Sequence, residues 1–294
     1  MVTVNTAITP SIGKNVVIDL KSLKLECTNW FDSSLKAVII NPLLNYVFTP
    51  RVVKFFQRVT QNHIVANLNG PGSWKSMLAH YGAAPKSAFD FMIDRYVAFP
   101  SGLRNRQKLV VSALTQLIEA YGKEQAVNLV AIGCGSGNNI LQAVQIEKPK
   151  VAGIKAQLFD LNQDALNQGK LKCQEMGLDK EVEFICADAN QMEGKISAPP
   201  QIVKMIGLME YLSDENVIGL LESIKKFRAP SSSILISSIE PGHGIDRFLR
   251  RTLNFNLNYR GPEKLKQLLQ EFGYTRFNIF SEPTGIFNVI VGHV

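Results

Sequence analysis

A glycine-rich loop between an apolar run and a helical run constrains the fold of this 294-residue chain more than any other feature. Residues 127–133, VNLVAIG, predict a short buried strand, and a helical pattern follows over 136–148. Gly133, Gly135 and Gly137 alternate in the turn between them. Glycine permits a tight turn and lets backbone N–H groups come close to a ligand. The loop therefore predicts a ligand site at the carboxyl end of a strand.

Strand-like and helix-like segments alternate after this loop. We expect helices over 162–177, 213–227 and 261–273, and strands over 154–160, 181–188, 201–209 and 232–240. Two strand-like runs, 274–282 and 284–294, close the chain as a hairpin. The alternation predicts a mostly parallel α/β sheet with helices on both faces and an antiparallel last strand. Ligands of such sheets bind at the carboxyl ends of the strands.

Two carboxylates follow the expected strands at positions suited to a nucleoside. The loop reads G-x-G-x-G, whereas dinucleotide sites use G-x-G-x-x-G, so a ligand without pyrophosphate is favoured, such as an amino acid attached to a nucleoside. Asp160 ends the second strand and could accept hydrogen bonds from both ribose hydroxyls. Asp188 ends the third strand and could accept from an adenine amino group. We include their neighbours Leu161 and Ala189 in the predicted cofactor site.

With these motifs the chain resembles the class I S-adenosylmethionine-dependent methyltransferases. Residues 207–212, GLMEYL, are similar to a stretch of one bacterial methyltransferase family, some members of which are attached to α/β-hydrolases. The segments SGLRNR (101–106) and GIF (285–287) are similar too. The resemblance runs from about Ile93 to the C-terminus. It implies a Rossmann-like sheet of seven strands, S-adenosyl-L-methionine as cofactor and S-adenosyl-L-homocysteine as product.

This resemblance divides the chain into two parts. We expect a Rossmann-like catalytic domain over 101–294 and a helical N-terminal extension or lid over 1–100. Gly207 is a predicted cofactor contact. Arg104 and Arg106 lie on a helix that should cross the mouth of the site, where one of them, Arg106 in our assignment, could pair with the methionine carboxylate.

The candidate catalytic residues lie in loops above the expected sheet. Methyl transfer mainly requires alignment of the acceptor, with a general base where the acceptor must lose a proton. His243, after the fifth strand, has a suitable unperturbed pKa. Glu210 and Tyr211, after the fourth strand, could contact the methionine end or the acceptor. The structural alternatives are a loop histidine bonded to backbone and a glutamate that braces its own loop.

Basic residues are concentrated in the N-terminal third. Residues 1–110 hold 13 Lys and Arg against 5 Asp and Glu, whereas the remaining 184 residues hold 19 against 20. This excess is typical of a chain that meets an anionic surface, an acidic carrier protein, a phosphorylated substrate or a nucleic acid, although it could serve solubility alone. We expect a small or lipophilic acceptor, anionic or carrier-bound.

One segment of this third combines apolar and basic residues. Residues 37–44 are strongly apolar, and 50–59 place four apolar residues at helical spacing opposite three basic ones: Val52, Phe55, Phe56 and Val59 against Arg51, Lys54 and Arg58. Such a segment could pack over the core as a lid, lie on a lipid surface or form a dimer face. Because an apolar stripe more often belongs to a core, we favour packing.

Other classes of protein are less well supported. No apolar run reaches the roughly 20 residues of a membrane span, and the first residues lack the order of a signal peptide. The four cysteines lack CxxC spacing and the four histidines are scattered, so we expect buried thiols, a cytoplasmic setting and no metal site. Nucleic acid is a disfavoured acceptor because no Asn/Asp-Pro-Pro-aromatic loop follows the fourth strand. Transfer of another cofactor group and a module that only binds the cofactor are the further alternatives.

Overall fold

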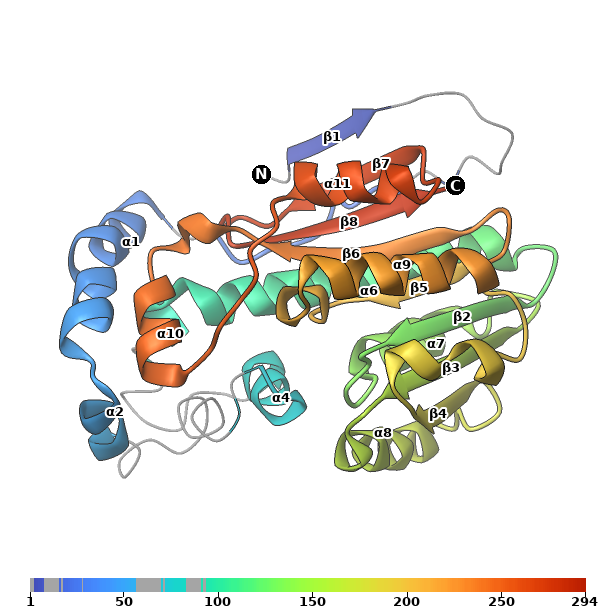
Figure 1. Ribbon diagram of the computed structural model, residues 1–294, viewed down its shortest axis with the longest axis horizontal. Coiled ribbons are helices and arrows are strands. Elements are labelled where there is room, and N and C mark those ends of the chain that lie inside the picture. Colours follow the sequence, from blue (N-terminus) through green and yellow to red (C-terminus); the bar gives the residue numbers. More distant parts are fainter. Residues whose placement is uncertain are drawn as a thin grey trace.

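A mixed sheet forms the centre of the structure (Figure 1). The computed structural model describes residues 3–7, 16, 18–27, 29–56, 70, 72–82, 91 and 94–294. Its strands lie in the order β1-β7-β8-β6-β5-β2-β3-β4. The expected strands are all present: β2 (Val127–Ile132), β3 (Ile154–Asp160), β4 (Val182–Cys186), β5 (Ile202–Met205), β6 (Ser233–Ile239), β7 (Arg276–Ser281) and β8 (Phe287–His293). The predicted Rossmann-like sheet of seven strands is confirmed.

The last strand runs antiparallel to its neighbours, as predicted. Strands β2 to β6 pair in parallel, whereas β8 lies between β6 and β7 and is antiparallel to both. The buried carboxylate of Glu282 holds the turn of this hairpin, because its Oε1 atom accepts backbone N–H bonds from Ile286 at 2.9 Å and Phe287 at 3.1 Å. Gly285 supplies the left-handed conformation of the turn, at φ +72°.

The N-terminal extension begins with a strand, although we expected it to be helical. Strand β1 (Thr3–Ala7) pairs antiparallel with β7 and makes the sheet eight-stranded. An edge strand presents a row of backbone groups without partners, and an extended segment can satisfy them. This long-range pairing accounts for the strand, whereas the described residues 30–56 and 74–82 that follow are mainly helical, as expected.

Helices cover both faces of the sheet, as the alternation predicted. One hydrophobic cluster joins the sheet to α6 (Ala98–Gly122), α7 (Asn138–Glu147) and α8 (Gln163–Glu175). A second cluster joins the opposite face to α9 (Asp214–Phe227) and α11 (Pro262–Glu271). Short 3₁₀ turns follow the strand ends: η3 (Ala189–Gln191), η4 (Glu193–Lys195), η5 (Met209–Tyr211) and η6 (Pro241–His243). Strand β5 ends earlier than expected because Gly207 turns the chain at φ +72°.

The other described helices come mostly from the N-terminal part of the chain. They are α1 (Trp30–Leu35), the π-helical η1 (Lys36–Ile40) and η2 (Leu43–Val47), α2 (Pro50–Phe56), α4 (Trp74–Gly82) and α10 (Asp246–Leu253). Figure 1 shows α1 and α2 in blue beside α10, away from β2, β3 and β4. The predicted domain boundary at residue 100 falls in the first turn of α6. None of the helices in the described part of the chain is long and apolar enough to cross a bilayer.

The cysteines depart from expectation. All four are free thiols, and Cys173 is buried as predicted, but Cys27 and Cys186 are exposed. Cys186 ends β4, the last strand of the sheet, where no further strand covers it. Cys27 lies in irregular chain before α1. The expectation of four buried thiols is therefore wrong for these two residues, and Cys134 is half-buried.

Candidate active site

A cavity of about 310 Å³ opens at the carboxyl ends of β2, β3 and β5. This is the sheet edge at which the parallel topology was expected to place a ligand. The cavity brings together seven of the residues predicted from sequence, which come from α6, the glycine loop and two further strand ends: Arg106, Gly133, Gly135, Asp160, Gly207, Glu210 and Tyr211.

The glycine loop has the conformation that its sequence implies. Gly133, Gly135 and Gly137 have φ angles of +63°, +57° and +69°. Residues with a side chain rarely adopt this backbone conformation. Asp160 fastens the loop to β3, since its Oδ2 atom accepts from the Gly135 backbone N–H at 2.6 Å and its Oδ1 atom from that of Asn162 at 2.8 Å. Each oxygen of an ionised carboxylate has a second lone pair, so Asp160 can still accept from ligand hydroxyls.

Arg106 points its guanidinium into this cavity from α6. The residue is 5% exposed, and its guanidinium stacks on the ring of Phe287, with 4.7 Å from Cζ to the ring centroid. Its Nη2 atom lies 3.5 Å from the Tyr81 hydroxyl. None of the carboxylates in the described residues forms an ion pair with it. A buried guanidinium without an ion-pair partner is suited to binding an anionic group of a ligand.

Lys204 is a second buried cation in the cavity and was missed by the sequence analysis. It lies on β5 and is 3% exposed. Burial lowers the pKa of its ammonium from 10.5 to about 8; Cys134 and Asp160 oppose this shift and Arg106 adds to it. The available signal was a lone lysine inside the apolar run IVKM of a strand expected to be buried on both faces.

Glu210 and Tyr211 reach the cavity from η5. Glu210 is buried, and its Oε1 atom accepts from the Ser237 hydroxyl at 3.0 Å. Burial raises the pKa of Glu210, against the opposing effect of Arg106. The pKa of Tyr211 is also raised, by burial of its phenol and then by Glu210. Its ring stands 5.8 Å from that of Phe255. The shift keeps the proton on the Tyr211 hydroxyl, and it makes the Glu210 carboxyl less acidic than an exposed one.

Three buried polar atoms around the cavity have no hydrogen-bond partner within the part of the chain that the structure describes. They are Arg106 Nε, Asn139 Oδ1 and Glu210 Oε2, and all three residues line the cavity. Buried polar groups in folded proteins are normally satisfied. A ligand with both donors and acceptors, such as an amino acid joined to a nucleoside, fits these atoms.

The rest of the cavity wall is largely apolar and aromatic. Its members come mainly from α4, α6 and the chain after α10: Trp74, Met77, Leu78, Tyr81, Phe99, Leu103, Phe255 and Phe287. Helix α4 lies against the glycine loop, because a Cβ atom on Gly135 would come within 3.4 Å of Trp74 Cβ. None of these residues was predicted as a site residue from the sequence, because an aromatic or aliphatic residue that lines a cavity has no local pattern to distinguish it from core.

The remaining predicted cofactor residues lie outside the cavity lining. Gly137 begins α7 and packs toward Leu158 and Phe184. Asp188 caps η3 by accepting from the Asn190 backbone N–H at 2.8 Å. Leu161 is exposed and Ala189 is half-buried. As contacts to the adenine end these positions stay predictions. No cluster of three or more His, Cys, Asp or Glu side chains placed to hold a metal occurs among the described residues.

His243 uses both ring nitrogens within its own loop. Tyr259 donates to Asp246 Oδ1 at 2.5 Å, so its oxygen accepts from His243 Nε2–H at 2.9 Å. His243 Nδ1 accepts from the Ile245 backbone N–H at 3.2 Å. Burial lowers the pKa of His243, with Asp246 opposing the shift. His243 is also absent from the cavity lining, so the geometry assigns it to holding this loop and does not favour a general base.

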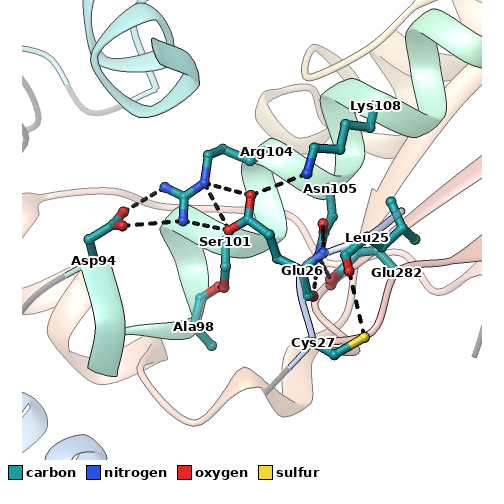
Figure 2. Close-up of polar contacts among 10 residues, drawn as sticks. All are labelled: Leu25, Glu26, Cys27, Asp94, Ala98, Ser101, Arg104, Asn105, Lys108 and Glu282. Carbon is teal, nitrogen blue, oxygen red and sulfur yellow. Dashed lines mark hydrogen bonds and ion pairs between the residues drawn. The ribbon is translucent and has the colours of Figure 1, made fainter. Parts of the chain in front are cut away.

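Arg104 is held elsewhere. Figure 2 shows its guanidinium between two carboxylates: Nε donates to Glu26 Oε1 at 2.9 Å and Nη1 to Asp94 Oδ1 at 2.5 Å. Asn105 adds paired bonds with the Glu26 backbone, at 2.8 and 2.9 Å. This cluster fastens the N-terminal segment to α6. Arg104 is therefore not available to a cofactor carboxylate, which leaves Arg106 as the candidate.

The comparisons with known proteins agree with this geometry. Residues 87–293 match the model of a family described as "Putative methyltransferase". Magnesium protoporphyrin IX methyltransferase of Synechocystis PCC 6803 with bound SAH has a similar structure, with a TM-score of 0.55 at 14% identity over 88% of this chain and 99% of that one. The CMeT domain of the citrinin polyketide synthase has a TM-score of 0.56 at 12% identity, over 82% and 68%. No curated protein matches the sequence.

A Bordetella parapertussis protein described as a possible exported protein is also similar, with a TM-score of 0.61 at 14% identity over 72% of this chain and 75% of that one. At such identities these solved structures establish the fold. The family match covers well over half of the chain.

Proposed function

The chain belongs to this methyltransferase family, and we propose that it uses S-adenosylmethionine to methylate a small lipophilic acceptor in the cavity. One observation carries the proposal. The glycine loop and Asp160, which suit a nucleoside, share a single cavity with an aromatic and aliphatic wall. Cofactor and acceptor could therefore meet within it, away from bulk water.

The cofactor fits the polar side of the cavity. Asp160 would accept from the ribose hydroxyls, and the backbone of Gly133 and Gly135 would lie along the methionine chain. Arg106 would bind the methionine carboxylate, with Lys204 as a second cation nearby. When bound, the cofactor supplies a methyl group on a sulfonium, whose sulfur is a good leaving group.

The protein would contribute alignment and exclusion of water. A displacement at the methyl carbon needs reacting atoms held about 3–3.5 Å apart and in line. The wall of Trp74, Phe255 and Phe287 presents apolar surface to an acceptor. Tyr211, whose raised pKa keeps the proton on its hydroxyl, would donate a hydrogen bond to the acceptor or to the methionine end, and Glu210 would contact the same groups.

The cofactor assignment is tested by titration calorimetry with S-adenosylmethionine and S-adenosylhomocysteine. We expect micromolar binding that weakens at least about tenfold in Asp160→Asn, which loses a charge-assisted acceptor. Asp164→Asn is the matched control, because Asp164 is an exposed residue on the neighbouring helix α8. Failure of the native protein to bind either ligand would remove the proposal.

The acceptor class is tested with radiolabelled methyl cofactor. Aromatic and long-chain small molecules, with and without a carboxylate, are offered in turn, and label is counted in organic extract, protein and nucleic acid. We expect label in the organic extract, with a product mass increased by one methylene. Label in nucleic acid or on a carrier protein would show that the acceptor is a macromolecule or is bound to one. A mass increase larger than one methylene would show that another group of the cofactor is transferred. The expected cytoplasmic setting stays a prediction.

A further inference from the structure

The helical arm, which we define as residues 30–56, buries charged side chains and exposes apolar ones in its first three helices. Through α1, η1 and η2 its charged side chains face the protein, and Asp32 and Lys36 are both buried. Its large apolar side chains face outward: Trp30, Phe31, Val38, Ile39, Leu43, Tyr46 and Val47 are all exposed. A surface helix normally buries its apolar stripe and exposes its charges. This arm therefore presents to its surroundings the face that a solvated helix would hide.

The inner face of the arm is firmly attached. Asp32 forms an ion pair with Arg95 at 3.1 Å. The Asn45 side chain donates to the Gly244 carbonyl at 2.7 Å and accepts from the Phe248 backbone N–H at 2.9 Å. Leu44 is buried in a cluster that includes residues of the cavity wall. These contacts fix the orientation of the arm, and they therefore determine which of its faces points away from the protein.

The outer face carries most of the exposed apolar side chains of the arm. Trp30 is 78% exposed, Val38 73% and Tyr46 66%. From Val38 to Val47 the exposed apolar positions recur every three to five residues, and Phe31 lies seven residues before Val38, so these positions fall on one side of the arm. Contiguous apolar surface of this kind marks a contact site for a protein or a membrane.

Positive charge borders this stripe. Residues 33–56 contain no Asp or Glu, and Arg51 and Lys54 of α2 are exposed. Arg247 and Arg251 of the adjacent helix α10 are exposed too, and the Arg247 guanidinium lies over the Tyr46 ring at 5.1 Å. Within the described residues none of these four cations has a carboxylate partner. None of these four cations lines the cavity.

We propose that the outer face of the helical arm docks on the surface of an anionic lipid bilayer. Apolar side chains would enter the boundary between headgroups and acyl chains, and the bordering cations would meet lipid phosphates. The indole of Trp30 suits this depth, where amphipathic rings accumulate. A second copy of the chain fits less well, because a symmetric contact would oppose cations with cations. Packing, the interpretation we favoured from sequence, describes only the inner face. Residues 57–59 of the predicted apolar stripe lie outside the described residues.

This inference goes beyond the proposed function. Binding to vesicles requires neither cofactor nor acceptor, so either proposal can fail alone. The two are compatible, because the hydrophobic cluster behind the arm, which contains Leu44, also contains Leu103 and Phe287 of the cavity wall. A lipophilic acceptor dissolved in the bilayer would then lie close to the enzyme.

The test is co-sedimentation with vesicles of phosphatidylcholine, with and without phosphatidylglycerol. We expect binding to the anionic vesicles, at least about tenfold weaker binding to neutral ones, and release by salt. Ile39→Asp should reduce binding about tenfold or more, and Arg51→Gln and Lys54→Gln about fivefold each. The matched control is Leu171→Asp on α8, because Leu171 is 56% exposed and Ile39 is 54% exposed. This control should bind like the native protein, and both variants should keep the native melting temperature.

A second readout follows the arm directly. Trp30 and Trp74 are the only two tryptophans of the chain, so Trp74→Phe leaves Trp30 as the single indole reporter. Its emission should shift to the blue on addition of anionic vesicles. Equal binding by Ile39→Asp and the native protein, or no binding and no shift, would overturn the proposal. A doubled mass in solution that Ile39→Asp abolishes, without vesicle binding, would assign the face to a second copy instead.

Discussion

Replacing Arg106 by methionine should weaken cofactor binding while leaving the free protein at least as stable as the native one. In the free protein Arg106 is 5% exposed, and its Nε atom has no partner among the described residues. Arg106 forms no ion pair among the described residues, and burial of its guanidinium is opposed only by the more distant charges of neighbours such as Glu210. Such a cation adds little to the free energy of unfolding, whereas methionine of similar length retains most of the apolar contact. The variant therefore separates a role in binding from a role in folding.

The size of the binding loss follows from the same geometry. Removing one partner of a buried, hydrogen-bonded charge pair costs about 2–5 kcal/mol. This corresponds to roughly 30-fold to a few-thousand-fold in the dissociation constant of S-adenosylhomocysteine. Arg106→Lys keeps the charge but loses bidentate geometry, so its affinity should lie between those of the native protein and Arg106→Met.

The assay combines calorimetric titration of S-adenosylhomocysteine with thermal and urea unfolding of the free protein. Arg104→Met is the matched control on the same helix. It breaks contacts to Glu26 and Asp94, so it should lose about 2 kcal/mol of stability and little affinity. Binding by Arg106→Met within about threefold of native would refute the carboxylate assignment. If Arg106→Met lost as much free energy of unfolding as the Arg104→Met control, Arg106 would have a role in folding and the reasoning would be refuted.

Three further substitutions test the loop and two buried titratable groups. Gly137→Ala should lose at least about 2 kcal/mol in urea unfolding, because φ is +69° and the new Cβ would lie 2.6 Å from Leu158 Cδ2. Gly177→Ala, at φ +65° with nothing within 4 Å, should show the smaller backbone strain alone; equal losses would contradict the packing argument. Burial lowers the pKa of Lys204 from 10.5 to about 8, so the unfolded state binds more protons between those values, and native stability should rise by about 3 kcal/mol from pH 8 to 10.5. Lys204→Met should be more stable at pH 7 by a similar amount and lose this pH dependence; an unchanged slope would show that Lys204 does not titrate as stated. Burial also lowers the pKa of His293 from 6.5 to about 4, so stability should fall by about 3 kcal/mol as the pH drops through that range, and His293→Gln should flatten the decline in acid titrations followed by circular dichroism.

The sequence alone determined seven strands of the sheet and the edge at which the candidate site lies, but not the pairing of β1. Apolar runs of strand length, punctuated by glycine and alternating with helical runs, are local signals, and the parallel sheet then has few alternatives. Parallel strands bring their carboxyl ends to one edge, so Gly133, Gly135 and Asp160 had to meet once their strands were recognised. The closing hairpin was equally local, because Gly285 supplies its turn.

The tertiary structure alone decided which polar side chains face the cavity. Arg104 and Arg106 are two residues apart on α6, about 200° around the helix, and the sequence offered both as candidates, of which we assigned Arg106. Glu26, 78 positions away, binds one of them, and the other faces the cavity. Likewise, His243 forms a hydrogen bond with Tyr259, and Lys204 lies in the site only because the glycine loop, with Cys134, packs beside it.

The tertiary structure also decided that the helical arm exposes its apolar side chains. Its sequence shows where apolar and basic residues lie, but not which face turns inward. That choice is made by Asn45 and Leu44, whose partners lie as far away as Phe248. Local periodicity determines secondary structure, whereas contacts between residues distant in sequence determine which side of each element meets the core, the ligand or the surroundings.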